Sequence, residues 1–101
     1  KVIKEVDVFF PNSFSPNGDN INDFFFPVSS SDLIKINHLS IFDRWGANVF
    51  NNRNFSVNDP NSGWDGRFKG QALMPGVYIY TAEVGVADQI KKYYGEITII
   101  R

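Results

Sequence analysis

Short apolar segments run along the whole chain, and turns rich in Gly, Pro, Asn, Asp and Ser separate them. Within several segments apolar and polar residues alternate with a period of two, as in a strand with one buried face. Helical periodicity is hard to find. The segments expected to form strands are residues 5–10, 23–28, 36–44, 48–51, 64–68, 77–84 and 90–101. About seven short strands at this spacing predict an all-β fold, a sandwich or a barrel.

Alternation is clearest in the last two expected strands, and it predicts which side chains share a face. In residues 77–84 one face carries Tyr78, Tyr80, Ala82 and Val84, and the other carries Val77, Ile79 and Thr81. In residues 90–101 one face carries Tyr93, Ile97 and Ile99, and the other carries Tyr94, Glu96 and Thr98. The three consecutive Phe residues 24–26 predict apolar contact on both sides of their strand, or one exposed ring. Residues 51–63, rich in Asn, Ser, Asp and Pro, are expected to form the longest loop.

Length and charge limit the function classes. The 101 residues are enough for one domain, residues 1–101, but not for two. The net charge of -1 offers no basic surplus for nucleic acid or an anionic membrane. No stretch approaches the roughly 20 apolar residues that span a bilayer. Without cysteine, the fold must rely on packing or on a metal ion. Residues 1–5 lack the apolar region of a signal peptide, so we expect either a protein that is not exported by its own N-terminus or a fragment of a longer protein.

Side-chain oxygens gather in the loop that joins the first two expected strands. Five of them occur within seven residues, around Gly18: Asn17, Asp19, Asn20, Asn22 and Asp23. Calcium takes about six to eight oxygen ligands from such loops. Asp19 and Asp23 would supply the charge, and Asn17 and Asn22 neutral amide oxygens. The spacing is not that of an EF-hand, and a cluster of Asx-turns without an ion is the alternative. Both interpretations remain open.

Each tryptophan belongs to a three-residue motif that also contains a charged residue and a glycine. The two motifs are Arg44-Trp45-Gly46 and Trp64-Asp65-Gly66. Asp65 is expected to fix a bulge by accepting backbone N–H bonds. Arg44 could pair with Asp65 or Asp43, or stack on an aromatic ring. The structural interpretation is that the glycines shape corners and both indole rings plug the ends of the core. The alternative is that exposed Trp and Tyr rings grip a sugar.

The sequence offers only weak candidates for a set of catalytic residues, so we expect no enzyme and no catalytic residues. His38 is the one histidine, and no cysteine exists to pair with it. The serines lie outside any nucleophile elbow, and no glycine-rich phosphate loop precedes a helix.

Several motifs follow one another in a specific order: residues 10–19, Asn22-Asp23, residues 41–46, Val49-Phe50, residues 63–66, Gly70, residues 75–80 and residues 95–101. This set, which includes Gly76 and Tyr78, resembles the gliding motility-associated C-terminal domain of Bacteroidetes, the type B sorting domain of the type IX secretion system. The resemblance covers nearly the whole chain. Residues 64–66 and 75–78 are also similar to the immunoglobulin-like domain of flagellar hook-capping proteins, which implies an immunoglobulin-like β-sandwich. Asn20 stands where glycine is common in the family, and Asn tolerates the left-handed conformation.

The resemblance implies a non-catalytic secretion signal. It would direct a large passenger, covalently attached upstream, from the periplasm across the outer membrane to the cell surface or the medium. The implied partners are the type IX translocon and an outer-membrane protein of the PorP/SprF kind, and the domain is expected to be a monomer that ends its polypeptide near Arg101. The alternative is a carbohydrate- or surface-binding β-sandwich module. Sugar binding needs coplanar exposed rings, whereas a sorting domain should bury Trp45 and Trp64.

Overall fold

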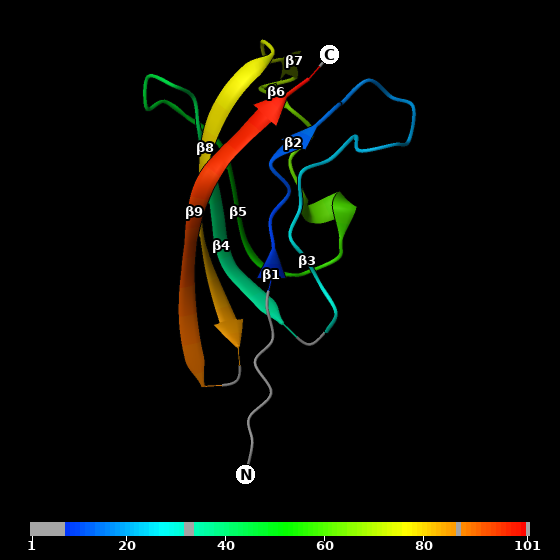
Figure 1. Ribbon diagram of the computed structural model, residues 1–101. Coiled ribbons are helices and arrows are strands. Elements are labelled where there is room, and N and C mark those ends of the chain that lie inside the picture. The colour runs from blue at the N-terminus through cyan, green and yellow to red at the C-terminus, as the bar shows by residue number, and fades with distance from the viewer. Residues whose placement is uncertain (1–7, 32–33, 87, 101) are drawn as a thin grey trace.

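The larger layer of the fold is a sheet of five strands in the order β2-β9-β8-β4-β5. It is seen in a computed structural model that describes residues 8–31, 34–86 and 88–100 (Figure 1). Its strands are β2 (Ser13–Phe14), β4 (Lys35–Phe42), β5 (Asn48–Ser56), β8 (Gly76–Val86) and β9 (Gln89–Ile99). All neighbours are antiparallel except β2 and β9, which run parallel.

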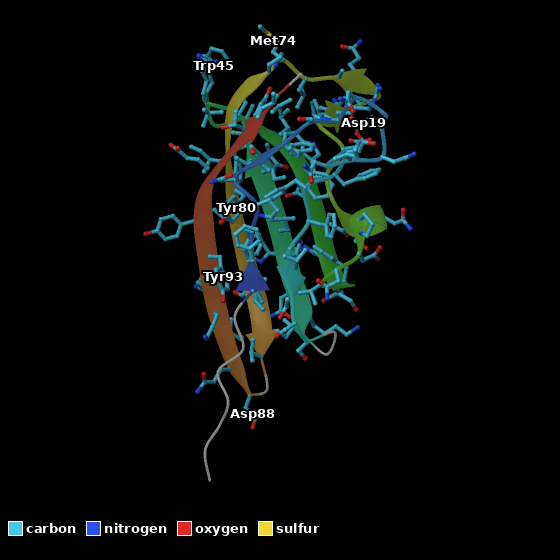
Figure 2. All side chains as sticks on the ribbon, turned by 45° about the vertical axis from the view of Figure 1, so that its right-hand side comes forward. Asp19, Trp45, Met74, Tyr80, Asp88 and Tyr93 are labelled. Carbon is cyan, nitrogen blue, oxygen red and sulfur yellow. The ribbon has the colours of Figure 1, made fainter. Side chains whose placement is uncertain are left out.

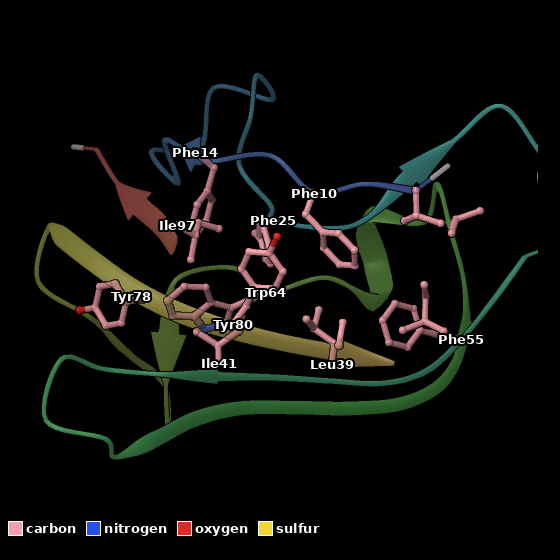
Figure 3. Packing of buried hydrophobic residues seen from close by; sticks show 14 of the residues in the cluster. Phe10, Phe14, Phe25, Leu39, Ile41, Phe55, Trp64, Tyr78, Tyr80 and Ile97 are labelled. Atoms are coloured by element: carbon pink, nitrogen blue, oxygen red, sulfur yellow. The ribbon is translucent and has the colours of Figure 1, made fainter. Parts of the chain in front are cut away.

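The second layer consists of short strands and loops that cover one face of this sheet (Figures 1 and 3). In it, β1 (Val8–Phe9) pairs with β3 (Val28–Ser29). A separate small hairpin joins β6 (Arg67–Phe68) to β7 (Gln71–Ala72), and η1 (Pro60–Ser62) is a single 3-10 turn. None of the helical structure in the described ranges is long and apolar enough to cross a membrane. The predicted all-β, sandwich-like architecture is confirmed.

The alternation predicted for β8 is confirmed, and it defines the inner face of the sheet. Tyr78, Tyr80, Ala82 and Val84 are buried, whereas Val77 and Ile79 are each 44% exposed on the other face. On β9, Ile97 and Ile99 are buried, and Tyr94 is exposed. Buried Leu39 and Ile41 of β4 extend the same inner face.

Aromatic rings join the two layers (Figure 3). Phe10 stacks on Tyr80 with 4.9 Å between ring centroids, and it also contacts Tyr93 at 5.2 Å. Burial, followed by the neighbouring Tyr93, raises the pKa of Tyr80 above its ordinary value. Gly95 lies opposite Tyr80 in the sheet, and a Cβ atom at Gly95 would come within 3.0 Å of that ring. Because Gly95 has no side chain, the Tyr80 ring can occupy the space beside it.

The loop predicted for residues 51–63 begins later than expected, because β5 continues to Ser56. The prediction of a loop is wrong for residues 51–56. Strand β4 is long enough to pair with them up to the register Lys35–Ser56, and Phe55 is buried. The polar residues face solvent or bond locally, and Asn52 donates its side-chain amide to the Ser62 carbonyl at 2.9 Å. Strand pairing thus outweighs the turn preference of the Asn-rich sequence.

The strand predicted for residues 23–28 is also mostly wrong. Phe25 forms an isolated bridge with Trp64, and only Val28 enters a strand. Pro27 lacks an N–H group, which prevents a continuous ladder here. Phe25 is fully buried and Phe24 is 39% exposed, so the prediction of one exposed ring is confirmed. Of the first expected strand, residues 5–7 lie outside the described residues.

Removal of the last strand should unfold the domain. Ile97 and Ile99 are 0% and 1% exposed. Their strand lies between β8 and β2, so a truncation of residues 95–101 removes core and pairing together. In the milder variant Ile97→Ala we expect a loss of about 2–5 kcal/mol in the free energy of unfolding. Ile100→Ala is the control, because Ile100 is 50% exposed. Thermal melting followed by circular dichroism checks this, and equal melting temperatures for both variants would contradict it.

Candidate functional site

The loop between β2 and Phe25 is organised by the Asp23 carboxylate. Its Oδ1 accepts the backbone N–H groups of Asn17 at 3.2 Å and Gly18 at 3.1 Å, and its Oδ2 accepts that of Asn20 at 2.7 Å. The side chain of Asn17 accepts the N–H of Asp19 at 3.1 Å. These are the local bonds of Asx-turns, and they hold the loop by contacts between its own residues.

The backbone of this loop uses the left-handed region three times. Gly18 has φ 80°, Asn20 has φ 64° and Asn22 has φ 54°. Asn20 thus adopts the conformation that glycine adopts most easily, as its residue type allows. The Ser15 N–H closes the loop by donating to the Asn22 carbonyl at 2.8 Å.

The four residues proposed as calcium ligands lie in this one loop. Asp19 is exposed and Asp23 is partly buried. Asp19 accepts the Ile21 N–H at 2.9 Å, so each of the two carboxylates already bonds to the backbone. Within the described part of the chain, no group of three or more His, Cys, Asp or Glu side chains gathers at one point. A calcium ion would therefore depend on the lone pairs left on these oxygens and on amide or backbone oxygens. The site stays a prediction.

The Trp64-Asp65-Gly66 motif is structural, as predicted. Trp64 is fully buried, and its indole N–H donates to the Arg67 carbonyl at 3.1 Å. Asp65 accepts the Arg67 backbone N–H at 3.0 Å, which confirms the backbone bond predicted for this carboxylate, although the bond lies in a turn and not in a bulge. Gly66 has φ 77°, a conformation that favours glycine.

The burial predicted for Trp45 is wrong, because its side chain is 82% exposed. The turn that follows β4 explains this. Asp43 Oδ1 accepts the N–H groups of Trp45 and Ala47, each at 2.9 Å, and Gly46 takes φ 86°. The tight turn directs the indole away from the sheet (Figure 2). Of the partners predicted for Arg44, the aromatic ring is the one found, with Cζ 5.1 Å from the centroid of the Trp45 ring.

Met74 is a surface residue that the sequence analysis did not single out. It is 78% exposed, and it lies near Trp45 at the same end of the molecule (Figure 2). The Tyr78 hydroxyl donates to the Met74 carbonyl at 2.8 Å, and Gly76 has φ 140°. A cleft of about 310 Å³ is lined by residues from both segments, including Trp45, Met74 and Tyr78. In the sequence, the Pro75-Gly76 pair directly after Met74 predicts a turn, and this was the one feature that could have indicated an exposed Met74 side chain.

Loss of the Asp23 carboxylate should weaken the fold even without any ion. Asp23→Ala leaves three backbone N–H groups without their acceptor, and water replaces it only in part. We expect a loss of about 1–3 kcal/mol in the free energy of unfolding, measured in chelator by thermal melting. Asp88→Ala, at an exposed turn, is the control and should leave the melting temperature unchanged. An unchanged melting temperature in Asp23→Ala would contradict the role of this carboxylate.

Calcium binding has a separate signature. An ion that binds only the folded state at a hundredfold excess over its Kd adds about 2.7 kcal/mol to the free energy of unfolding. The melting temperature would then be several degrees higher in millimolar calcium than in chelator. The difference should disappear in Asp19→Ala and in Asp23→Ala. Coinciding curves for the unaltered protein would favour the Asx-turn interpretation.

A comparison with protein families matches residues 8–99 to the CHU_C type IX secretion signal domain. A comparison with curated proteins finds no matching relative. The family match runs from the first residue of β1 to the last residue of β9, and it therefore includes both Trp motifs and the Asp23 loop. The resemblance argued from the motifs is confirmed: the chain belongs to the type IX secretion signal domain family.

Proposed function

We propose that the domain directs an attached passenger protein across the outer membrane, through the type IX translocon, to the cell surface or the medium. The family match over residues 8–99 is the observation that carries this proposal. The passenger would precede the domain in the chain and reach the periplasm by an export signal of its own.

We further propose that the domain is a recognition element without catalytic activity. Its carboxylates support this, because Asp23, Asp43 and Asp65 each accept backbone N–H bonds in turns. Carboxylates used in this way shape the surface and are poorly placed to move protons for a substrate. The partners would be translocon components, together with an outer-membrane protein of the PorP/SprF kind, and the domain would act as a monomer.

A carbohydrate- or surface-binding module is the second candidate, and the exposure of Trp45 favours it. Sugar binding by aromatic residues needs an open ring face, usually with a second ring beside it. In the described part of the chain, the Trp45 ring has the Arg44 guanidinium over it and contacts no other exposed ring. The sorting role therefore remains the better supported of the two.

A passenger fusion tests the sorting role. A fluorescent protein with an N-terminal export signal is joined to residues 1–101 and produced in a host with an active type IX system, with a PorP/SprF-like partner co-expressed. We expect the fluorescent protein at the cell surface or in the medium. The controls are the same fusion without the domain and the same host without its translocon, and both should retain the passenger in the periplasm. A folded fusion that stays in the periplasm while native cargo is exported would contradict the proposal.

A further inference from the structure

We propose that Trp45, Arg44 and Met74 form the docking site for a protein partner that presents an aliphatic side chain next to a carboxylate. This inference rests on the proposed sorting function and names the surface that recognition would use. The site lies at one end of the molecule, where the turn after β4 meets the segment that precedes β8 (Figure 2).

The fold holds this surface in a defined shape. The Asp43 carboxylate accepts two N–H groups of the turn, and the Gly46 N–H donates to the Asp43 carbonyl at 3.0 Å. On the facing segment, Tyr78 fixes the Met74 carbonyl by its hydroxyl. Little conformational freedom of the backbone would be lost on binding, which favours affinity. The hydrogen-bonded turn therefore holds the Trp45 indole in place while leaving it 82% exposed.

The surface is concave and extends onto the sheet. The cleft of about 310 Å³ beside Trp45 and Met74 shares Arg44 and Val77 with a second cleft of about 410 Å³. The second cleft reaches Ile79 and the carboxylate-bearing Glu96, and both Val77 and Ile79 are 44% exposed. An aliphatic side chain inserted between Trp45 and Met74 would continue this apolar strip.

Arg44 specifies the charge of the partner. Its guanidinium lies over the Trp45 ring, and it makes no hydrogen bond or ion pair with any of the described residues. The neighbouring Asp43 carboxylate is used within its own turn. A guanidinium held on an aromatic ring with its donors available is well suited to a bidentate carboxylate. The complementary group on the partner is therefore Asp or Glu.

The chemistry of the surface favours a protein over a glycan or a membrane. Trp and Arg dominate the energetic centres of protein interfaces, and Met is enriched there. A glycan site would offer several amide and carboxylate groups around an open ring, but here the Arg44 guanidinium lies over one face of the ring, and beside Asp43 the lining includes the apolar Leu73, Met74 and Pro75. A site for anionic lipid would need a cluster of cations, whereas the whole chain has a net charge of -1.

Two exposed aromatic residues give a matched pair of variants for the passenger fusion. Trp45 and Tyr94 are both 82% exposed, but Tyr94 lies on β9, outside both clefts. We expect Trp45→Ala to lower export at least about tenfold, as for truncation at the centre of an interface, and Tyr94→Ala to leave it unchanged. Thermal melting verifies that both variants fold.

Charge reversal gives an independent comparison. Arg44→Glu should lower export as strongly as Trp45→Ala, and Arg44→Lys should retain part of it because lysine keeps the charge without the planar fork. Lys92→Glu is the control, an exposed cation on β9 outside both clefts. Equal export by the unaltered fusion and by folded Trp45→Ala and Arg44→Glu would overturn the docking site and leave the sorting role intact. Failure of the unaltered fusion would instead overturn the sorting role.

Iodide quenching of tryptophan fluorescence tests the other classes of partner. Trp64 is fully buried, so quenching in the unaltered domain reports on Trp45. We expect vesicles of phosphatidylcholine and phosphatidylglycerol to leave the quenching unchanged, and soluble glucan oligosaccharides to do the same. Protection of Trp45 by the vesicles would assign the surface to a membrane. Protection by the oligosaccharides would assign it to a glycan, and either result would overturn the protein partner.

Discussion

The pairing of Trp64 with Phe25 is the contact on which the second layer depends. The backbone N–H of each residue donates to the carbonyl of the other, at 2.8 and 2.9 Å, and both side chains are fully buried. Around them, the strands that the described residues form in this layer are each two residues long and bury little by themselves. Gly63 allows this approach, because a Cβ atom there would lie 2.5 Å from the Phe25 carbonyl oxygen. Loss of a buried Trp side chain costs about 3–5 kcal/mol, a large part of the stability of a small domain.

The two tryptophan motifs have opposite roles, although the sequence places each beside a charged residue and a glycine. In both, an Asp side chain accepts backbone N–H bonds and a glycine adopts a positive φ. The difference is the side of the chain on which the indole lies. Trp64 faces the sheet and finds the Arg67 carbonyl for its N–H, whereas Trp45 is carried past the end of β4. The same turn chemistry thus serves the core in one place and the surface in the other.

Local pattern predicted the parts of this fold that are regular. The alternation in β8 and β9 was enough to assign their inner faces, and the turn roles of Asp65 and Asn20 followed from residue type. The extension of β5 to Ser56 could not be read from an Asn-rich segment, because it depends on the length of β4. The exposure of Trp45 and the place of Met74 could not be read either, because both depend on how two turns from distant parts of the chain meet at one end of the sheet.

The parallel pairing of β2 with β9 has a consequence for folding kinetics. Ser13 and Phe14 lie beside Thr98 and Ile99, from opposite ends of the described chain. Hairpins such as β8–β9 close short loops and can form early, whereas this pair must close the longest loop in the sheet. Among the described residues, strand β2 has no other partner in the sheet, so it stays unpaired until Thr98 and Ile99 are available. During folding, the aromatic side of β8 therefore remains incompletely covered until the last strand has paired, and in this interval the chain is most exposed to aggregation or to a chaperone.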